Sequence, residues 1–117
     1  MEQKPLPSPD TEYAIARAMT ALSHPRRVAL FTILEDAGPP GLGFDELLKR
    51  SKLSISTLRH HLRPMQAAGL VVRRRKGVNV VFRLHGQAVR RSADLVVQRL
   101  AAIPPSPRGG LSPPPLN

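Results

Sequence analysis

The 117-residue sequence contains no cysteine and no tryptophan, and only one tyrosine and three phenylalanines. Without thiols the chain can form no disulfide, no thiolate metal site and no redox-sensing thiol. Long hydrophobic runs are missing too: none approaches the roughly 18 residues that cross a bilayer. The start, MEQKPLPSPD, also lacks the apolar stretch of a signal peptide. We therefore expect a cytoplasmic protein, and its length predicts one domain with a modest core.

Negative charge is almost absent from the second half of the chain. Lys and Arg number 18 against 8 Asp and Glu, for a net charge of +10, and every acid except Asp94 lies at or before Glu46. Between residues 47 and 93 all charges are positive: Lys49, Arg50, Lys52, Arg59, Arg63, Arg73, Arg74, Arg75, Lys76, Arg83, Arg90 and Arg91. Because phosphate contacts release condensed counterions, such a block favours nucleic-acid binding. The alternative is a solvated basic surface, although solvated surfaces usually mix signs.

Proline is concentrated at the two ends of the sequence, where nine of the thirteen prolines lie. The end PPSPRGGLSPPPLN has almost nothing to bury. Segments of this composition gain too little from burial to fold. We therefore predict disordered tails at 1–10 and 104–117, and one folded domain at 11–103.

Apolar spacing predicts a helix near each end of this domain and one between them. Residues 13–22 are amphipathic, with Asp10 or Thr11 as the cap, and residues 87–103 repeat the pattern up to Pro104. Pro25 suits a first helical position and starts a central helix that is apolar on most sides. A short helix from Phe44 to about Ser51 follows.

The stretch SISTLRHHLRPM predicts a fourth helix with two distinct faces. Ser54 is a natural N-cap, and Leu58, Leu62 and Met65 lie on one side at spacings of four and three. The opposite side carries polar and basic side chains, namely Ser56, Arg59, His60 and Arg63.

After Gly69 the apolar period changes from helical to two. The segment LVVRRR, a turn around Lys76 and Gly77, and the segment VNVVFRL predict a basic hairpin, with Val78 on the same face as Phe82. A short helix, a tight turn, a capped polar-faced helix and a basic hairpin are the elements of a winged helix-turn-helix. The predicted fold is mainly α with a small β-hairpin, comprising five helices and a two-stranded wing.

The segments ALSHPRRVALFTIL (21–34), KLSISTLRHHL (52–62), AAGLVVRRRKG (67–77) and VVFRL (80–84) resemble the ArsR family of transcriptional repressors. The resemblance implies a homodimer, built by the first and last helices, that binds double-stranded DNA at an inverted repeat. It places the DNA-facing residues on the fourth helix and the wing. The full candidate set is Ser54, Ile55, Ser56, Thr57, Arg59, His60, Arg63, Arg73, Arg74, Arg75, Lys76 and Asn79.

The sequence departs from the family in its turn, in its fourth helix and in its sensing sites. Lys52 stands where members usually have glycine, so the turn either contains a strained left-handed residue or is rearranged. Pro64 removes a helical hydrogen bond and predicts a kink. Gly43 and Asp45 occupy the positions of a Cys-x-Cys metal motif, and the last helix offers Asp94 but no histidine. We expect no metal and no cofactor, and the effector stays unidentified.

The histidines favour structural roles, with one exception. His60 and His61 lie about 100° apart around a helix and cannot easily chelate one ion. We expect His61 to pack inward beside Leu58, His60 to contact DNA, and His24 to cap the second helix, while His85 ends the wing.

Other classes of function fit the sequence less well. No Ser, His and Asp cluster supports catalysis, so we expect no enzyme. An RNA-binding or ribosome-associated winged helix is the main alternative, but the deep, narrow RNA major groove would not admit this helix. A protein-binding winged helix would account for the hydrophobic residues but not for the arginines.

Overall fold

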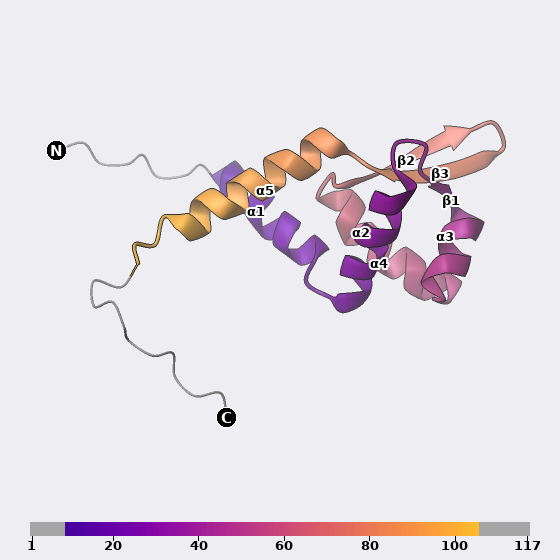
Figure 1. Ribbon diagram of the computed structural model, residues 1–117, viewed down its shortest axis with the longest axis horizontal. Coiled ribbons are helices and arrows are strands. Elements are labelled where there is room, and N and C mark those ends of the chain that lie inside the picture. The colour runs from indigo at the N-terminus through magenta and orange to yellow at the C-terminus, as the bar shows by residue number, and fades with distance from the viewer. Residues whose placement is uncertain (1–8, 106–117) are drawn as a thin grey trace, which may run out of the picture.

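A computed structural model describes residues 9–105, which form five helices and a three-stranded antiparallel sheet (Figure 1). The elements follow in the order α1 (Pro9–Ala21), α2 (Pro25–Ala37), β1 (Leu42–Gly43), α3 (Phe44–Ser51), α4 (Ile55–Ala67), β2 (Val71–Lys76), β3 (Asn79–Leu84) and α5 (Gly86–Ala101). This is the winged helix-turn-helix predicted from the apolar spacing. None of the helices in this range is long and apolar enough to span a membrane.

The hydrophobic core lies between α2, α3, α4 and the base of the hairpin. Its largest fully buried side chains are Leu30, Leu34, Leu47, Leu58, Leu62, Met65 and Val71. The three residues on α4 are the apolar side predicted for this helix, so burying them turns the polar side of α4 to solvent.

The sheet contains one strand more than the predicted two-stranded wing. β2 and β3 pair from Val71↔Leu84 to Lys76↔Asn79, and the two residues of β1 pair with β3 at Leu42↔Phe82 and Gly43↔Val81. A two-residue strand shows no periodicity, and spacing therefore gave no signal for it. Val78 was predicted to share a strand face with Phe82, but it lies in the turn and is 96% exposed.

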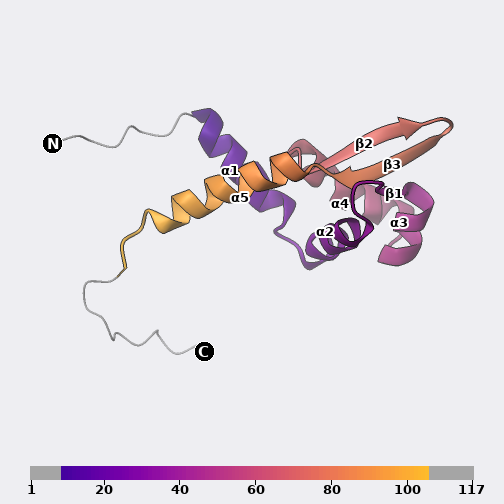
Figure 2. The same ribbon diagram turned by 45° about the horizontal axis from the view of Figure 1, so that its top comes forward.

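The helices α1 and α5 pack against each other and extend away from the core, on the side opposite to the hairpin (Figures 1 and 2). α5 contains no buried residue, and among residues 10–21 of α1 only Ala18 and Ala21 are buried. Several large apolar side chains of this α1–α5 arm stay in solvent, namely Tyr13, Met19, Val97 and Leu100, together with Leu22 directly after α1 and Ile103 beyond the end of α5.

The helix limits differ from the predicted ones by a few residues. α1 starts at Pro9, so residues 9 and 10, which were assigned to a tail, are helical. Proline suits a first helical position, and the carboxylates of Asp10 and Glu12 in the first turn complement the helix dipole. α5 ends at Ala101 rather than at 103. The predicted disorder of residues 1–8 and 106–117 falls outside the described residues.

Candidate nucleic-acid interface

The turn between α3 and α4 sets the position of the polar helix. Lys52 ends α3 with φ 59° and ψ 24°, so of the two predicted alternatives the strained left-handed residue is correct. Such a conformation costs a residue with a Cβ roughly 1 kcal/mol. Ser51 Oγ donates to the Leu48 carbonyl at 3.2 Å and accepts from the Leu53 amide at 3.4 Å, which supports the turn on both sides.

Ser54 caps α4 as predicted. Its Oγ accepts a hydrogen bond from the Thr57 amide at 3.2 Å and donates to Thr57 Oγ1 at 2.8 Å. Two of the predicted DNA-contacting residues therefore also fix the start of the helix on which the other candidates lie. Thr57 is only partly exposed.

Beyond the cap, α4 separates its side chains into a buried and an exposed face. Leu58, His61, Leu62 and Met65 are buried, and the helix runs without a break across Pro64 to Ala67. The exposed face carries the predicted residues Ile55, Ser56, Arg59, His60 and Arg63. Ile55 is 52% exposed and is an apolar side chain on this otherwise polar face.

Two hollows flank this face. A shallow one of about 660 Å³ covers the first turns of α4 and is lined by Ser54, Ile55, Ser56, Arg59, His60 and Arg63. A larger one of about 1040 Å³ lies between α4, the start of α3 and the hairpin, where Arg59, Arg63, Arg73, Lys76 and Asn79 contribute to its lining. Arg59 and Arg63 line both, and they form the ridge between the two hollows.

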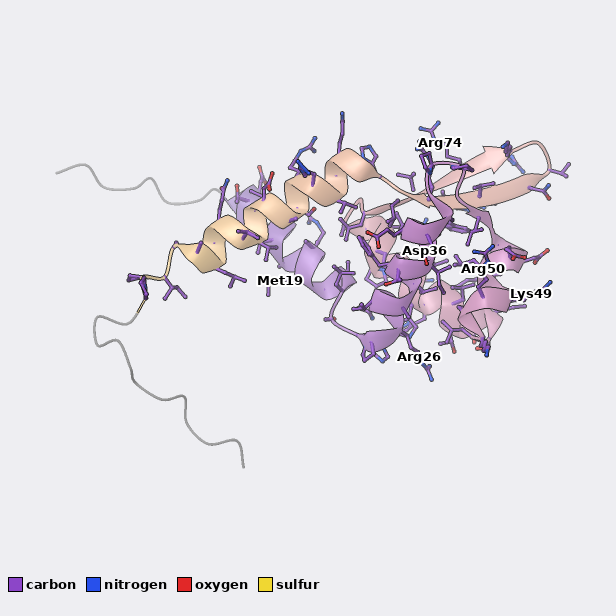
Figure 3. All side chains as sticks on the ribbon, in the orientation of Figure 1. Met19, Arg26, Asp36, Lys49, Arg50 and Arg74 are labelled. Atoms are coloured by element: carbon purple, nitrogen blue, oxygen red, sulfur yellow. The ribbon has the colours of Figure 1, made fainter. Side chains whose placement is uncertain are left out.

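The structure brings together nine of the twelve predicted contact residues around these hollows. Thr57, Arg74 and Arg75 line neither. Arg73, Arg74, Arg75 and Lys76 are all exposed on β2, and alternation along a strand turns Arg74 to the opposite side from Arg73 and Arg75. In Figure 3, Arg74 on the hairpin and Lys49 and Arg50 on α3 all lie to the right of Met19, on the hairpin side of the molecule.

Phe44, the first residue of α3, lies at this interface but was not among the predicted contact residues. Its ring lies 6.1 Å from that of Phe82, and the Arg59 guanidinium carbon lies 5.4 Å from the Phe44 ring centroid. Asp45 and Glu46 beside it bring carboxylates to the larger hollow, although Glu46 is paired with Arg50 at 3.1 Å. No periodic pattern links Phe44 to Arg59, since their contact crosses from one helix to the next.

A cluster of basic groups lies behind α4. His61 is 4% exposed, which confirms its predicted inward packing, and its ring lies 4.6 Å from that of His24 and 5.3 Å from that of His60. Burial lowers the pKa of His61, and nearby His24, Arg27, His60 and Arg26 lower it further. Nδ1 of His24 accepts from the Arg26 amide at 3.1 Å and caps α2 as predicted. Among residues 9–105 no cluster of His, Cys, Asp or Glu could hold a metal ion.

Comparisons with known proteins agree with this architecture. Residues 22–74 match a helix-turn-helix domain family. The chain is 31% identical over 74 residues to the HTH-type transcriptional regulator YgaV of Escherichia coli K12, covering 63% of this chain and 73% of that protein.

Comparisons with solved structures agree with this match and cover a larger share of the chain. An ArsR-like transcriptional regulator from Rhodococcus sp. RHA1 superposes with a TM-score of 0.68 at 27% identity, covering 80% of this chain and 84% of that one. HlyU from Vibrio cholerae superposes with a TM-score of 0.59 at 26% identity, covering 82% of this chain and 100% of that one. The homodimeric winged helix-turn-helix domain Mb0332 from Mycobacterium bovis shares the fold. Its TM-score is 0.65 at 20% identity, and the match covers 87% of this chain and 90% of that one. With the α3–α4 turn, the capped polar helix and the basic hairpin, these matches show that the chain belongs to the ArsR family of winged helix-turn-helix transcriptional regulators.

Proposed function

We propose that the protein is a homodimeric repressor that binds an inverted-repeat operator in double-stranded DNA. The observation that carries this proposal is the exposed, basic α4 face beside a basic hairpin. The width of the major groove of B-DNA suits an α-helix, and this face is the only side of α4 that the core leaves free. We place the protein in the cytoplasm, where a bacterial operator lies.

In this proposal the twelve residues divide into three roles. Ile55, Ser56, Arg59 and His60 meet base edges from the first turns of α4, where Arg59 suits a guanine. Ser54 and Thr57 hold the helix start and offer hydroxyls to the backbone. The remaining residues bind phosphates or the minor groove beside the helix, namely Arg63, Arg73, Arg74, Arg75, Lys76 and Asn79.

The α1–α5 arm supports the homodimer. Tyr13 is 64% exposed, Val97 61% and Leu100 58%, on two helices that lie side by side. Neighbouring apolar side chains of this size are seldom left in water. A two-fold dimer through this arm would present two α4 helices to two half-sites, which requires an inverted repeat. A dimer of this small size would repress by occupying the promoter.

Selection of bound sequences from random duplex DNA tests this proposal. The full-length protein should enrich one inverted repeat, with half-sites separated by about 10 base pairs or a multiple of that spacing. A parallel selection from random structured RNA provides the competing outcome. Enrichment of RNA hairpins with no preferred duplex would instead favour the RNA-binding alternative.

A further inference from the structure

The Arg59 side chain is held by an aromatic ring rather than by an acid. Its guanidinium carbon lies 5.4 Å from the centroid of the Phe44 ring. The described residues include no ion pair of Arg59 with a carboxylate, although Asp45 and Glu46 line the same hollow. A cation over a ring face keeps all its N–H donors free at its edge, whereas a salt bridge would occupy two of them.

The backbone fixes the position of the Phe44 ring. Gly43, directly before it, pairs with Val81 of the hairpin. The ring is half-buried and packs 6.1 Å from Phe82, a buried residue of β3. The preceding Gly41 lies so close to β3 that a Cβ there would come within 2.4 Å of the Phe82 carbonyl oxygen. Phe44 therefore connects the hairpin rigidly to the side chain of Arg59 on α4.

We propose that Phe44 is a positioning residue, which stacks on Arg59 and pre-orders its guanidinium for the base edge that it reads. This inference rests on the proposed DNA-binding function and adds a residue outside the predicted contact set. A free arginine loses rotamer entropy when it is fixed in a groove, and a side chain already restricted by stacking loses less. The benefit should appear only on the sequence that Arg59 recognises.

The test compares Phe44→Leu and Phe44→Tyr on the selected duplex and on a scrambled duplex. Phe44→Leu removes the ring face and should weaken the selected duplex about three- to tenfold, while the scrambled duplex changes less than twofold. Phe44→Tyr keeps the ring face and should retain the wild-type ratio. In an Arg59→Ala background, Phe44→Leu should have no further effect, because the stacked partner is gone.

Phe31→Leu is the matched control, because Phe31 is a partly buried phenylalanine of α2 that packs against the same core. It should lower the thermal midpoint as Phe44→Leu does and leave the ratio between the two duplexes unchanged. Equal losses of that ratio in Phe44→Leu and Phe31→Leu would overturn the proposal. So would a tighter selected complex of Phe44→Leu, since the stack would then compete with DNA.

A measurement without DNA separates this inference from the proposed function. The relaxation of the Arg59 Nε–Hε group by NMR should show restricted motion in the wild type and increased motion in Phe44→Leu, but not in Phe31→Leu. If the wild type prefers no duplex, the proposed function fails while this result still supports or refutes the stack. Equal Arg59 mobility in wild type and Phe44→Leu would overturn the positioning role.

Discussion

Nε of Arg27 donates a hydrogen bond to Nδ1 of His61 at 3.2 Å. The acceptor must be an unprotonated nitrogen, so the buried imidazole is neutral and carries its proton on Nε2. The same guanidinium donates through a terminal nitrogen to the Thr20 carbonyl at 2.6 Å. Arg27 thus joins the end of α1, the start of α2 and the back of α4, linking the apolar arm to the polar helix.

This arrangement predicts that the fold weakens in mild acid. Burial, followed by His24, Arg27, His60 and Arg26, holds the pKa of His61 below its ordinary value of 6.5, and each of these groups acts in the same direction. At a pH between the lowered pKa of His61 in the folded chain and its ordinary value in the unfolded chain, the unfolded chain binds more protons at this residue than the folded chain does. The stabilisation is therefore complete above about 6.5 and is lost as the pH falls through the lowered pKa. Thermal unfolding between pH 7.5 and 5 measures this loss.

Two variants assign the pH effect to one residue. His61→Gln has no titrating ring, and its thermal midpoint should depend less on pH than that of the wild type. His60→Gln removes an exposed histidine of the same helix, which is one of the smaller causes of the lowered pKa of His61, and should keep most of the wild-type dependence. Parallel pH curves for the wild type and His61→Gln would show that another group is responsible.

A second prediction separates steric closeness from backbone strain at two glycines. Gly41 and Gly69 have φ of 72° and 76°, but a Cβ at Gly41 would lie 2.4 Å from the Phe82 oxygen, whereas one at Gly69 meets nothing within 4 Å. Gly69→Ala should cost about 1 kcal/mol through strain alone. Gly41→Ala should cost at least twice as much, because β1 must also separate from β3. Urea unfolding measures both, and equal losses would contradict the close approach.

Features of this structure that depend on residues close together in the chain were predicted from the sequence, whereas contacts between distant segments were not. The Ser54 cap, the buried face of α4 and the presence of a basic hairpin follow from neighbours within a few residues, and each prediction is confirmed. β1 and the Phe44–Arg59 contact depend on segments brought together by the fold, and no local pattern encodes them. Lys52 lies between these cases: the family resemblance marked the position, but only the structure decides between strain and rearrangement.

The left-handed Lys52 gives a third prediction. Lys52→Gly should stabilise the fold by up to about 1 kcal/mol, because glycine adopts φ near 59° without a Cβ clash. Lys49→Gly is the matched control, since it removes the same charge from the interior of α3 and should destabilise by about 0.5–1 kcal/mol. Urea unfolding measures the change in stability of both variants. A loss of stability in Lys52→Gly would mean that the entropy of the unfolded chain outweighs the strain.

The proposed dimer is tested at the end of the apolar arm. Leu100→Glu places a charge on a side chain that is 58% exposed in the single chain. If the arm is the interface, this buried charge should convert dimer to monomer at micromolar concentration in sedimentation experiments. Val78→Glu at the hairpin tip places the same charge on an exposed valine outside the arm and should leave the oligomeric state unchanged. A dimer that persists in Leu100→Glu would exclude this interface.

The last prediction separates base recognition from phosphate binding. Arg59→Ala should cost roughly 1–3 kcal/mol on the selected duplex and relax one base position, because a bidentate contact to guanine is lost. Arg75→Ala on the hairpin should weaken selected and scrambled duplexes about equally and lower the salt slope by about 1 for each lost phosphate contact. Arg74 faces the other side of β2 from Arg75, so Arg74→Ala shows which side of the hairpin meets the backbone. Salt titrations of the three variants on both duplexes supply these values. Should Arg59→Ala leave the ratio between duplexes unchanged while a hairpin variant abolishes it, the hairpin would be the reading element and α4 the anchor.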